Sequence, residues 1–177
     1  MKSKIAWMIF GLFVIHIAVG TKTTFDEKKL YEITHKAITE LNANNKKEAS
    51  EILIKGDKIY RRNNFLRKIT LNRKNGYSYI NSSNSIKGRI ALLNNQLELA
   101  KSHLVKSGQI KSSPTLGSFG PNMSLARDLL QLGESKIVIE YLELCKLFWE
   151  HDSGQIEKWK EQISNNQIPN FGGNLIY

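Results

Sequence analysis

The chain has 177 residues, of which 41% are hydrophobic and 24% are charged, and these proportions exclude a disordered chain and a protein embedded in a membrane. Three prolines and 12 glycines exclude a collagen-like architecture, and a single cysteine excludes an internal disulfide framework and a zinc site with several thiolates. The net charge is +10, from 26 Lys and Arg against 16 Asp and Glu.

The first 20 residues have the pattern of a secretory signal peptide. A short basic start precedes an apolar stretch over residues 5–17, and Ala18 and Gly20 then supply the small residues that a signal peptidase accepts. We therefore expect residues 1–20 to be removed near Gly20, leaving an exported domain, periplasmic or secreted, over residues 21–177. The alternative is an uncleaved membrane anchor, but the stretch is short for a full span, and we expect no membrane span in the mature chain.

Downstream of Gly20, apolar residues recur at helical spacing almost throughout. The spacing predicts three pairs of helices, over residues 26–42 and 46–54, 82–93 and 96–106, and 123–132 and 135–149. Because the turn within each pair is short, we expect antiparallel hairpins. A last helix over residues 154–165 is predicted to cap the array, and the apolar tail 169–177 is predicted to pack against the body.

Without Lys2 and Lys4 of the N-terminal segment the net charge is +8, and nearly all of it lies in residues 55–74, where eight Lys and Arg stand against the single Asp57, a net +7. The apolar residues Ile59, Leu66 and Ile69 favour a partly buried helix whose basic outer face is solvated. The alternative is a surface for anionic lipid or polysaccharide. Nucleic acid is not the expected partner, because an exported protein seldom meets it. The candidate contacts to an anionic surface are Arg61, Arg62, Arg67 and Lys68.

Four positions recur in each predicted pair with the same spacing, the later three lying 12, 16 and 19 residues after the first. The three sets are Ala37, Ala49, Leu53 and Gly56; Gly88, Ala100, Leu104 and Ser107; and Ala126, Val138, Leu142 and Cys145. Small residues at the first and last positions let two helices approach closely, and the larger residue fills the groove between them. We therefore predict that Gly88, Ala100 and Leu104 are buried between the paired helices.

This spacing resembles the tetratricopeptide repeat family over about residues 25–149, and the second pair matches its motif best. The sequence departs from the family at the expected aromatic, which is Glu40, Ala91 or Leu129, and it lacks the closing proline. The pairs are also 51 and 38 residues apart, instead of about 34. The resemblance implies an all-α fold of antiparallel helical hairpins, stacked as a short solenoid with a C-terminal capping helix.

The resemblance also implies a concave face, built from the first helix of each pair, that holds a protein segment. In the second pair the residues facing this groove would be Ser82, Ser85 and Arg89. The loop over residues 113–123 is a further distinctive feature. With the Phe148-Trp149 pair and the closing Pro169-Asn170-Phe171-Gly172, it resembles a group of uncharacterised exported bacterial proteins with such repeats. This resemblance implies no known activity. We expect this loop to be packed, with Phe119 in the core, and not to bind a ligand.

Residues that carry catalysis are not arranged in a recognisable pattern. His35, His103 and His151 lack metal-ligand spacing with one another and with Cys145, and the sequence has no phosphate-binding glycine loop. We interpret Cys145 as a buried hydrophobe and His103 as a surface or half-buried residue. The sequence thus favours an exported, non-enzymatic protein-binding or scaffold module without a cofactor. The alternative is a surface-associating protein that binds anionic lipid or polysaccharide through residues 55–74.

Overall fold

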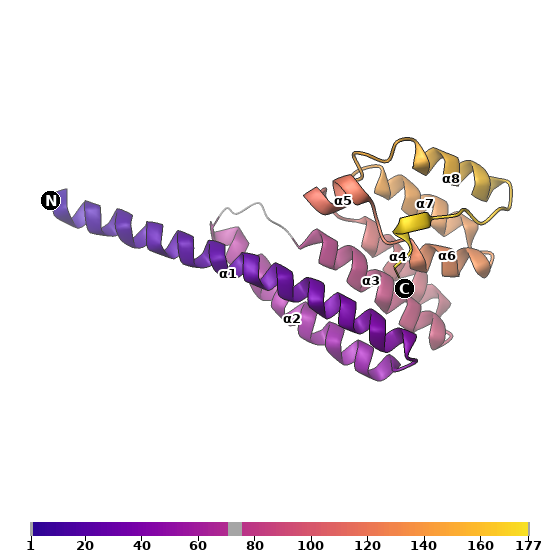
Figure 1. The fold of residues 1–177 in the computed structure, drawn as a ribbon, viewed down its shortest axis with the longest axis horizontal. Coiled ribbons are helices and arrows are strands. Elements are labelled where there is room, and N and C mark those ends of the chain that lie inside the picture. Colours follow the sequence, from indigo (N-terminus) through magenta and orange to yellow (C-terminus); the bar gives the residue numbers. More distant parts are fainter. Residues whose placement is uncertain (1, 71–75, 177) are drawn as a thin grey trace.

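The computed structural model describes residues 2–70 and 76–176, and in this part of the chain the structure is built from helices without strands (Figure 1). The all-α class expected from the sequence is confirmed. The helices are α1 (Lys2–Asn42), α2 (Lys46–Thr70), α3 (Tyr77–Leu93), α4 (Leu97–Gly108), α5 (Pro114–Phe119), α6 (Ser124–Gln131), α7 (Ser135–Cys145) and α8 (Gln155–Ser164), with a 3-10 turn, η1 (Gly172–Asn174), near the end.

Consecutive helices pack side by side in the order α1 with α2, α3 with α4, and α6 with α7, while α8 packs on α7 (Figure 1). The central element is α3, which contacts α1 and α2 on one side and α5 and α6 on the other. Every residue of α3 from Tyr77 to Leu92 is buried or half-buried as a result.

The prediction that the second helix ends at residue 54 is wrong, because α2 continues through Gly56 to Thr70. Gly56 does not break the helix; it is a point of close packing. A Cβ atom at this position would lie 2.4 Å from the Tyr79 hydroxyl oxygen and 2.9 Å from Cγ2 of Ile33. The missing side chain therefore lets α2 approach α3 and α1.

The turns inside the three helix pairs have the same hydrogen bonds and the same position relative to the recurring buried residues. Asn44, Asn95 and Gly133 each have a positive φ, of 63°, 57° and 82°. In each turn this residue donates its N–H to the carbonyl three residues earlier, and the next residue donates to the carbonyl five residues before itself. This is the Schellman ending of a helix. All three positive-φ residues follow the first recurring small residue, Ala37, Gly88 or Ala126, by seven positions.

All four recurring positions are buried in every pair, which confirms the predicted burial of Gly88, Ala100 and Leu104. The partner of Gly88 differs from the one expected. A Cβ atom there would lie 2.2 Å from Cδ2 of Leu125, which is on α6, so Gly88 permits close contact with the next pair as well as burial within its own.

The buried side chains form two clusters that share α3. The smaller one joins α1 and α2 to Ile86 and Ile90 of α3. The larger one extends from Ala91 through α4, α6, α7 and α8 to Phe171 in the tail. Two neighbouring faces of one helix thus serve two cores.

The expectation that Phe119 lies in the core is wrong, because its side chain is 75% exposed. The loop over residues 113–123 is packed against the body as expected, but through residues other than Phe119. Ser113 accepts a hydrogen bond from the Leu116 backbone at the start of α5, and both Leu116 and Gly117 are buried. Gly120 lies against the ring of Trp149, where a Cβ atom would be only 2.5 Å from Cε2.

The C-terminal tail packs against the body, as the sequence predicts, over the described residues 169–176. Phe171 is buried against Trp159, with ring centroids 4.9 Å apart. The side-chain amide of Asn174 donates hydrogen bonds to the carbonyls of Phe119 and Pro121, and the backbone carbonyl of Asn174 accepts from the backbone N–H of Met123. The tail therefore holds the loop that leads into α6.

The N-terminal half of α1 extends away from the rest of the molecule (Figure 1). The side chains of Trp7 and Phe10 are 74% and 58% exposed. Over residues 2–70 and 76–176, none of the helices has the combination of length and hydrophobicity needed to cross a membrane.

Candidate functional site

The three residues expected to face a groove lie on α3 in different environments. Ser82 is half-buried. Ser85 is only 1% exposed, and its hydroxyl has no hydrogen-bond partner, so the expectation that it contacts a partner is not compatible with its burial. Arg89 is half-buried, and its Nε donates to Oδ2 of Asp128 on α6 at 2.8 Å. Of this predicted group, Ser82 and Arg89 remain accessible.

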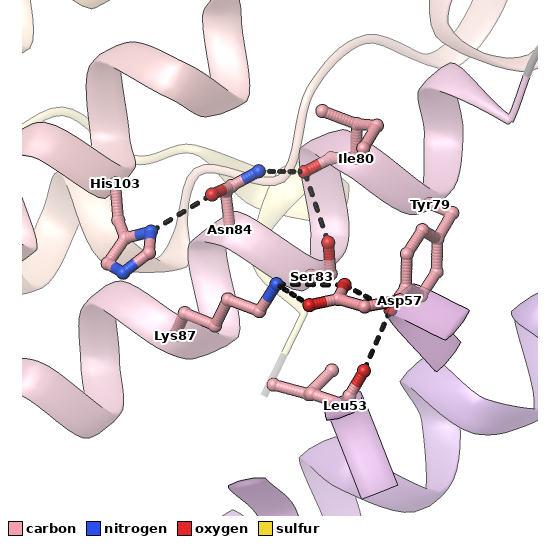
Figure 2. A network of polar contacts seen from close by, with 8 residues as sticks. All are labelled: Leu53, Asp57, Tyr79, Ile80, Ser83, Asn84, Lys87 and His103. Atoms are coloured by element: carbon pink, nitrogen blue, oxygen red, sulfur yellow. Dashed lines mark hydrogen bonds and ion pairs between the residues drawn. The ribbon is translucent and has the colours of Figure 1, made fainter. Parts of the chain in front are cut away.

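A second polar group joins α2 to α3 and was not predicted (Figure 2). Lys87 donates to both carboxylate oxygens of Asp57, at 2.9 and 2.8 Å, and the two side chains are 26% and 29% exposed. The Tyr79 hydroxyl donates to Asp57 at 2.8 Å and lies 3.2 Å from the Leu53 carbonyl. Burial and the Asp57 charge raise the pKa of Tyr79 well above its usual value, so this phenol remains protonated.

The polar group continues across α3 to α4 through Asn84 and His103. The Asn84 amide nitrogen donates to the Ile80 carbonyl, so its oxygen is free to accept from Nδ1 of His103 at 2.9 Å (Figure 2). Burial, reinforced by the charges of Lys106 and Lys87, lowers the pKa of His103 to about 4. His103 is therefore a neutral, half-buried residue near pH 7, and the sequence interpretation of its burial is confirmed.

Chemically, this group consists of the Asp57–Lys87 ion pair, the neutral Tyr79 hydroxyl bound to it, and the neutral Asn84–His103 hydrogen bond. Asp57 is occupied by Lys87 and Tyr79, and His103 by Asn84, so each titratable group has a fixed partner within hydrogen-bond distance. The arrangement orders the junction of α2, α3 and α4 and provides no activated nucleophile.

A buried amide performs a similar role on the opposite face of α3. Asn81 donates to the Ser107 carbonyl at 3.1 Å and to the Tyr141 hydroxyl at 3.2 Å, and its oxygen accepts from the backbone of Asn122 at 2.9 Å. One side chain thus ties α3 to α4, α7 and the loop before α6.

The candidate anionic-surface contacts on α2 are separated by the fold. Arg61 is exposed, and Arg62 is half-exposed while pairing with Asp26 of α1 at 3.1 Å. Arg67 is 6% exposed and pairs with Glu27, so burial removes it from any surface contact. The side chain of Lys68 lies outside the described residues. The expected basic outer face is therefore divided between exposed cations and cations that hold α1 to α2.

Cys145 is buried, and burial raises the pKa of its thiol well above the usual value, in agreement with its interpretation as a core hydrophobe. In the part of the chain that the structure describes, His, Cys, Asp and Glu do not gather in groups of three or more that could hold a metal ion.

Sequence reasoning missed the group around Asp57 because its members are far apart in the chain. The available signals were weak: Asp57 is the one acidic residue in a basic segment, and Tyr79, Ser83 and Lys87 follow one another at four-residue spacing. Neither signal identifies α2 and α3 as neighbours.

Comparisons with known proteins assign no relative to this architecture: no family model, curated protein or solved structure matches the chain.

Proposed function

We propose that the protein is an exported, non-enzymatic scaffold of tetratricopeptide-like helical repeats, stacked as a short solenoid and capped by α8, which binds a segment of a partner protein. The observation that carries the proposal is the recurrence of one turn at Asn44, Asn95 and Gly133, each at the same distance from a buried small residue. Recurrence of both turn and buried positions is expected of a chain built from stacked repeats.

The partner surface follows from the order of the helices. The first helices of the three pairs, α1, α3 and α6, contact one another in that order. By analogy with tetratricopeptide repeats, such helices line the concave face. Ser82 offers a hydroxyl there, and the Arg89–Asp128 pair offers a charge of each sign that a partner's polar groups can engage.

Export is supported by the composition and position of the N-terminal segment. The described apolar side chains Trp7, Phe10 and Val14 are all exposed, and both buried clusters begin further along the chain. Removal of residues 1–20 would therefore take no described side chain out of either core.

The test uses the buried thiol to advantage. Because Cys145 is buried, a cysteine introduced at Ser82 can be labelled selectively with a short photo-crosslinker. The matched control carries the label at Glu140, which is exposed on α7. In extracts of the native source, Ser82→Cys should give an adduct of discrete mass that unlabelled protein competes away. Equal adducts at the two positions, or none at Ser82, would contradict the proposal.

A further inference from the structure

The outer face of α2 combines exposed cations with exposed apolar side chains. We define this face by Ile54, Lys55, Lys58, Arg61, Arg62 and Phe65. Each of these residues has another member of the set three or four positions away, so all six lie along one side of the helix. Ile54 is 54% exposed and Phe65 is 65% exposed, so two large apolar groups lie in water at its two ends.

The charge of this face is largely uncompensated. Lys55, Lys58 and Arg61 form no ion pair with a described residue, and Arg62 is bound to Asp26. The acidic residue within this part of α2, Asp57, points to α3 and is occupied by Lys87. Glu51, one turn before this face, is exposed on the same side of the helix. The four cations that follow it leave a net positive surface, which attracts anions over about a Debye length.

The fold places this face next to the apolar N-terminal segment. The ion pairs Arg62–Asp26 and Arg67–Glu27 fix the basic end of α2 beside the point where α1 leaves the body (Figure 1). The apolar run over residues 5–17 lies nearer the N-terminus of α1, and its last residue is about two and a half turns before Asp26. Before residues 1–20 are removed, cations, exposed apolar side chains and an apolar helix thus lie at one end of the molecule. After their removal the cations and apolar side chains of α2 remain, and the docking rests on these.

We propose that the outer face of α2 docks on an anionic phospholipid membrane surface. Lys55, Lys58 and Arg61 would lie among the lipid phosphates, while Phe65 and Ile54 would enter the boundary between headgroups and acyl chains. A soluble polyanion matches the cations equally well but gains nothing from Phe65. This docking is independent of the repeat scaffold proposed above and uses the opposite side of the α1–α2 pair from α3.

The experiment is co-sedimentation of the full chain with vesicles of phosphatidylcholine alone or with phosphatidylglycerol added, at low and moderate salt. The variant Lys55→Gln/Lys58→Gln/Arg61→Gln removes three exposed, unpaired charges. The control Lys106→Gln/Lys111→Gln/Lys136→Gln removes the same charge from exposed positions elsewhere. Any binding through the apolar N-terminal segment is common to all proteins and is measured on phosphatidylcholine.

We expect the part of the affinity that depends on phosphatidylglycerol to fall at least about tenfold in the α2 variant and to change little in the control. Moderate salt should weaken the parent in the same way. Equal binding of the parent and the α2 variant to the anionic vesicles overturns the proposal.

A second variant separates a membrane from a soluble polyanion. Phe65→Ser should weaken binding to anionic vesicles several-fold while leaving binding to heparin unchanged. If Phe65→Ser affects neither and the α2 variant loses both equally, the ligand is a polyanion and the membrane proposal is wrong. Parallel thermal unfolding of all variants verifies that they are folded.

Discussion

Three arginines within seven positions of α2 have different physical roles, although their charges are identical. Arg61 is exposed, Arg62 reaches across to Asp26 while half in solvent, and Arg67 is almost fully buried against Glu27. A charge held out of water depends on its partner far more than one that water can solvate. The basic segment therefore includes a structural residue that charge counting alone does not distinguish.

Replacement of Arg67 should be much more costly than replacement of Arg61. Arg67→Gln leaves Glu27 without its cation and loosens α1 from α2, so we expect a loss of about 1–3 kcal/mol in the free energy of unfolding, reduced because Glu27 retains some solvent. Arg61→Gln should change it by less than about 0.5 kcal/mol. Urea unfolding measures both, and equal effects would show that the Arg67–Glu27 contact is not structural.

His103 should make the protein less stable as the solution becomes mildly acidic. Its pKa of about 4 in the folded state lies below the ordinary 6.5, so the unfolded chain binds more protons between these values and stability falls as pH falls through this window. Because the ring is half-exposed and solvent screens its interactions, we expect the free energy of unfolding to fall by only on the order of 1–2 kcal/mol across this window. The charged groups acting on it are Lys106, Lys87 and Asp57, from α4, α3 and α2.

The measurement is the free energy of unfolding at several pH values between 4 and 7, for the parent and for His103→Gln. The variant should show a smaller slope, since it keeps a polar side chain but cannot titrate. Lys160 and Lys146 lower the pKa values of Glu143 and Glu157, so protonation of these carboxylates at acid pH destabilises both proteins. Only the difference between the two curves therefore reports His103. Parallel curves would rule out this role.

At the scale of the elements, the first helix of each of the three pairs ends in the same turn, which also ends α8 at Asn166. The positive φ at Asn44, Asn95 and Gly133 reverses the chain after the first helix and returns two backbone donors to its last carbonyls. Asparagine adopts this conformation more readily than most residues other than glycine.

Asn95→Ala should therefore lower the free energy of unfolding by about 1 kcal/mol, because alanine is strained at a φ of 57°. Asn95→Gly provides the matched comparison and should be close to the parent, because glycine adopts this φ without strain. Chemical denaturation measures the free energy of unfolding of the three proteins. Equal stability of the alanine and glycine variants would show that the positive φ at residue 95 does not limit stability.

Many of the helices and buried residues could be predicted from local sequence, whereas the features that depend on contacts between distant residues could not. Residues within one pair, such as Ala100 and Leu104, carry a helical spacing that predicts their burial correctly. The recurring spacing predicts a close helix approach at Gly56, but local sequence reveals neither that α2 continues through it nor that Tyr79 and Ile33 are the residues beside it. Phe119 looked like a core residue by its type alone, but Trp149 occupies the place beside Gly120. The ion pair of Asp57 with Lys87 depends on the docking of one pair on the next, which no local pattern encodes.

Across the whole molecule, the C-terminal tail closes the larger core. Phe171 contributes its ring to Trp159, and Asn174 binds the loop that precedes α6, so the last described residues join elements that are about 50 residues apart in sequence. The tail is thus part of the fold and not an appendage of α8.

Phe171→Ala should cost about 3–5 kcal/mol, as large-to-small changes in a well-packed core do. Ile168→Ala, at a neighbouring position that is 47% exposed, should cost far less. Differential scanning calorimetry of the two variants decides this, and similar transition temperatures would indicate that the tail contributes little to the core.

The division of the interior into two clusters has a spectroscopic consequence. Trp149 and Trp159 lie in the larger cluster with ring centroids 5.5 Å apart, whereas the smaller cluster around α1 and α2 contains no tryptophan. The third tryptophan, Trp7, is 74% exposed on α1. In a Trp7→Phe variant, tryptophan emission therefore reports the melting of α7, α8 and the tail, while circular dichroism at 222 nm reports every helix. If the helix pairs are stacked repeats, as proposed, each interacts mainly with its neighbours and the two ends can melt separately. If the contacts of α3 with both clusters couple them fully, the two signals will give one midpoint in urea; if the α1–α2 pair melts first, the ellipticity will fall before the fluorescence changes.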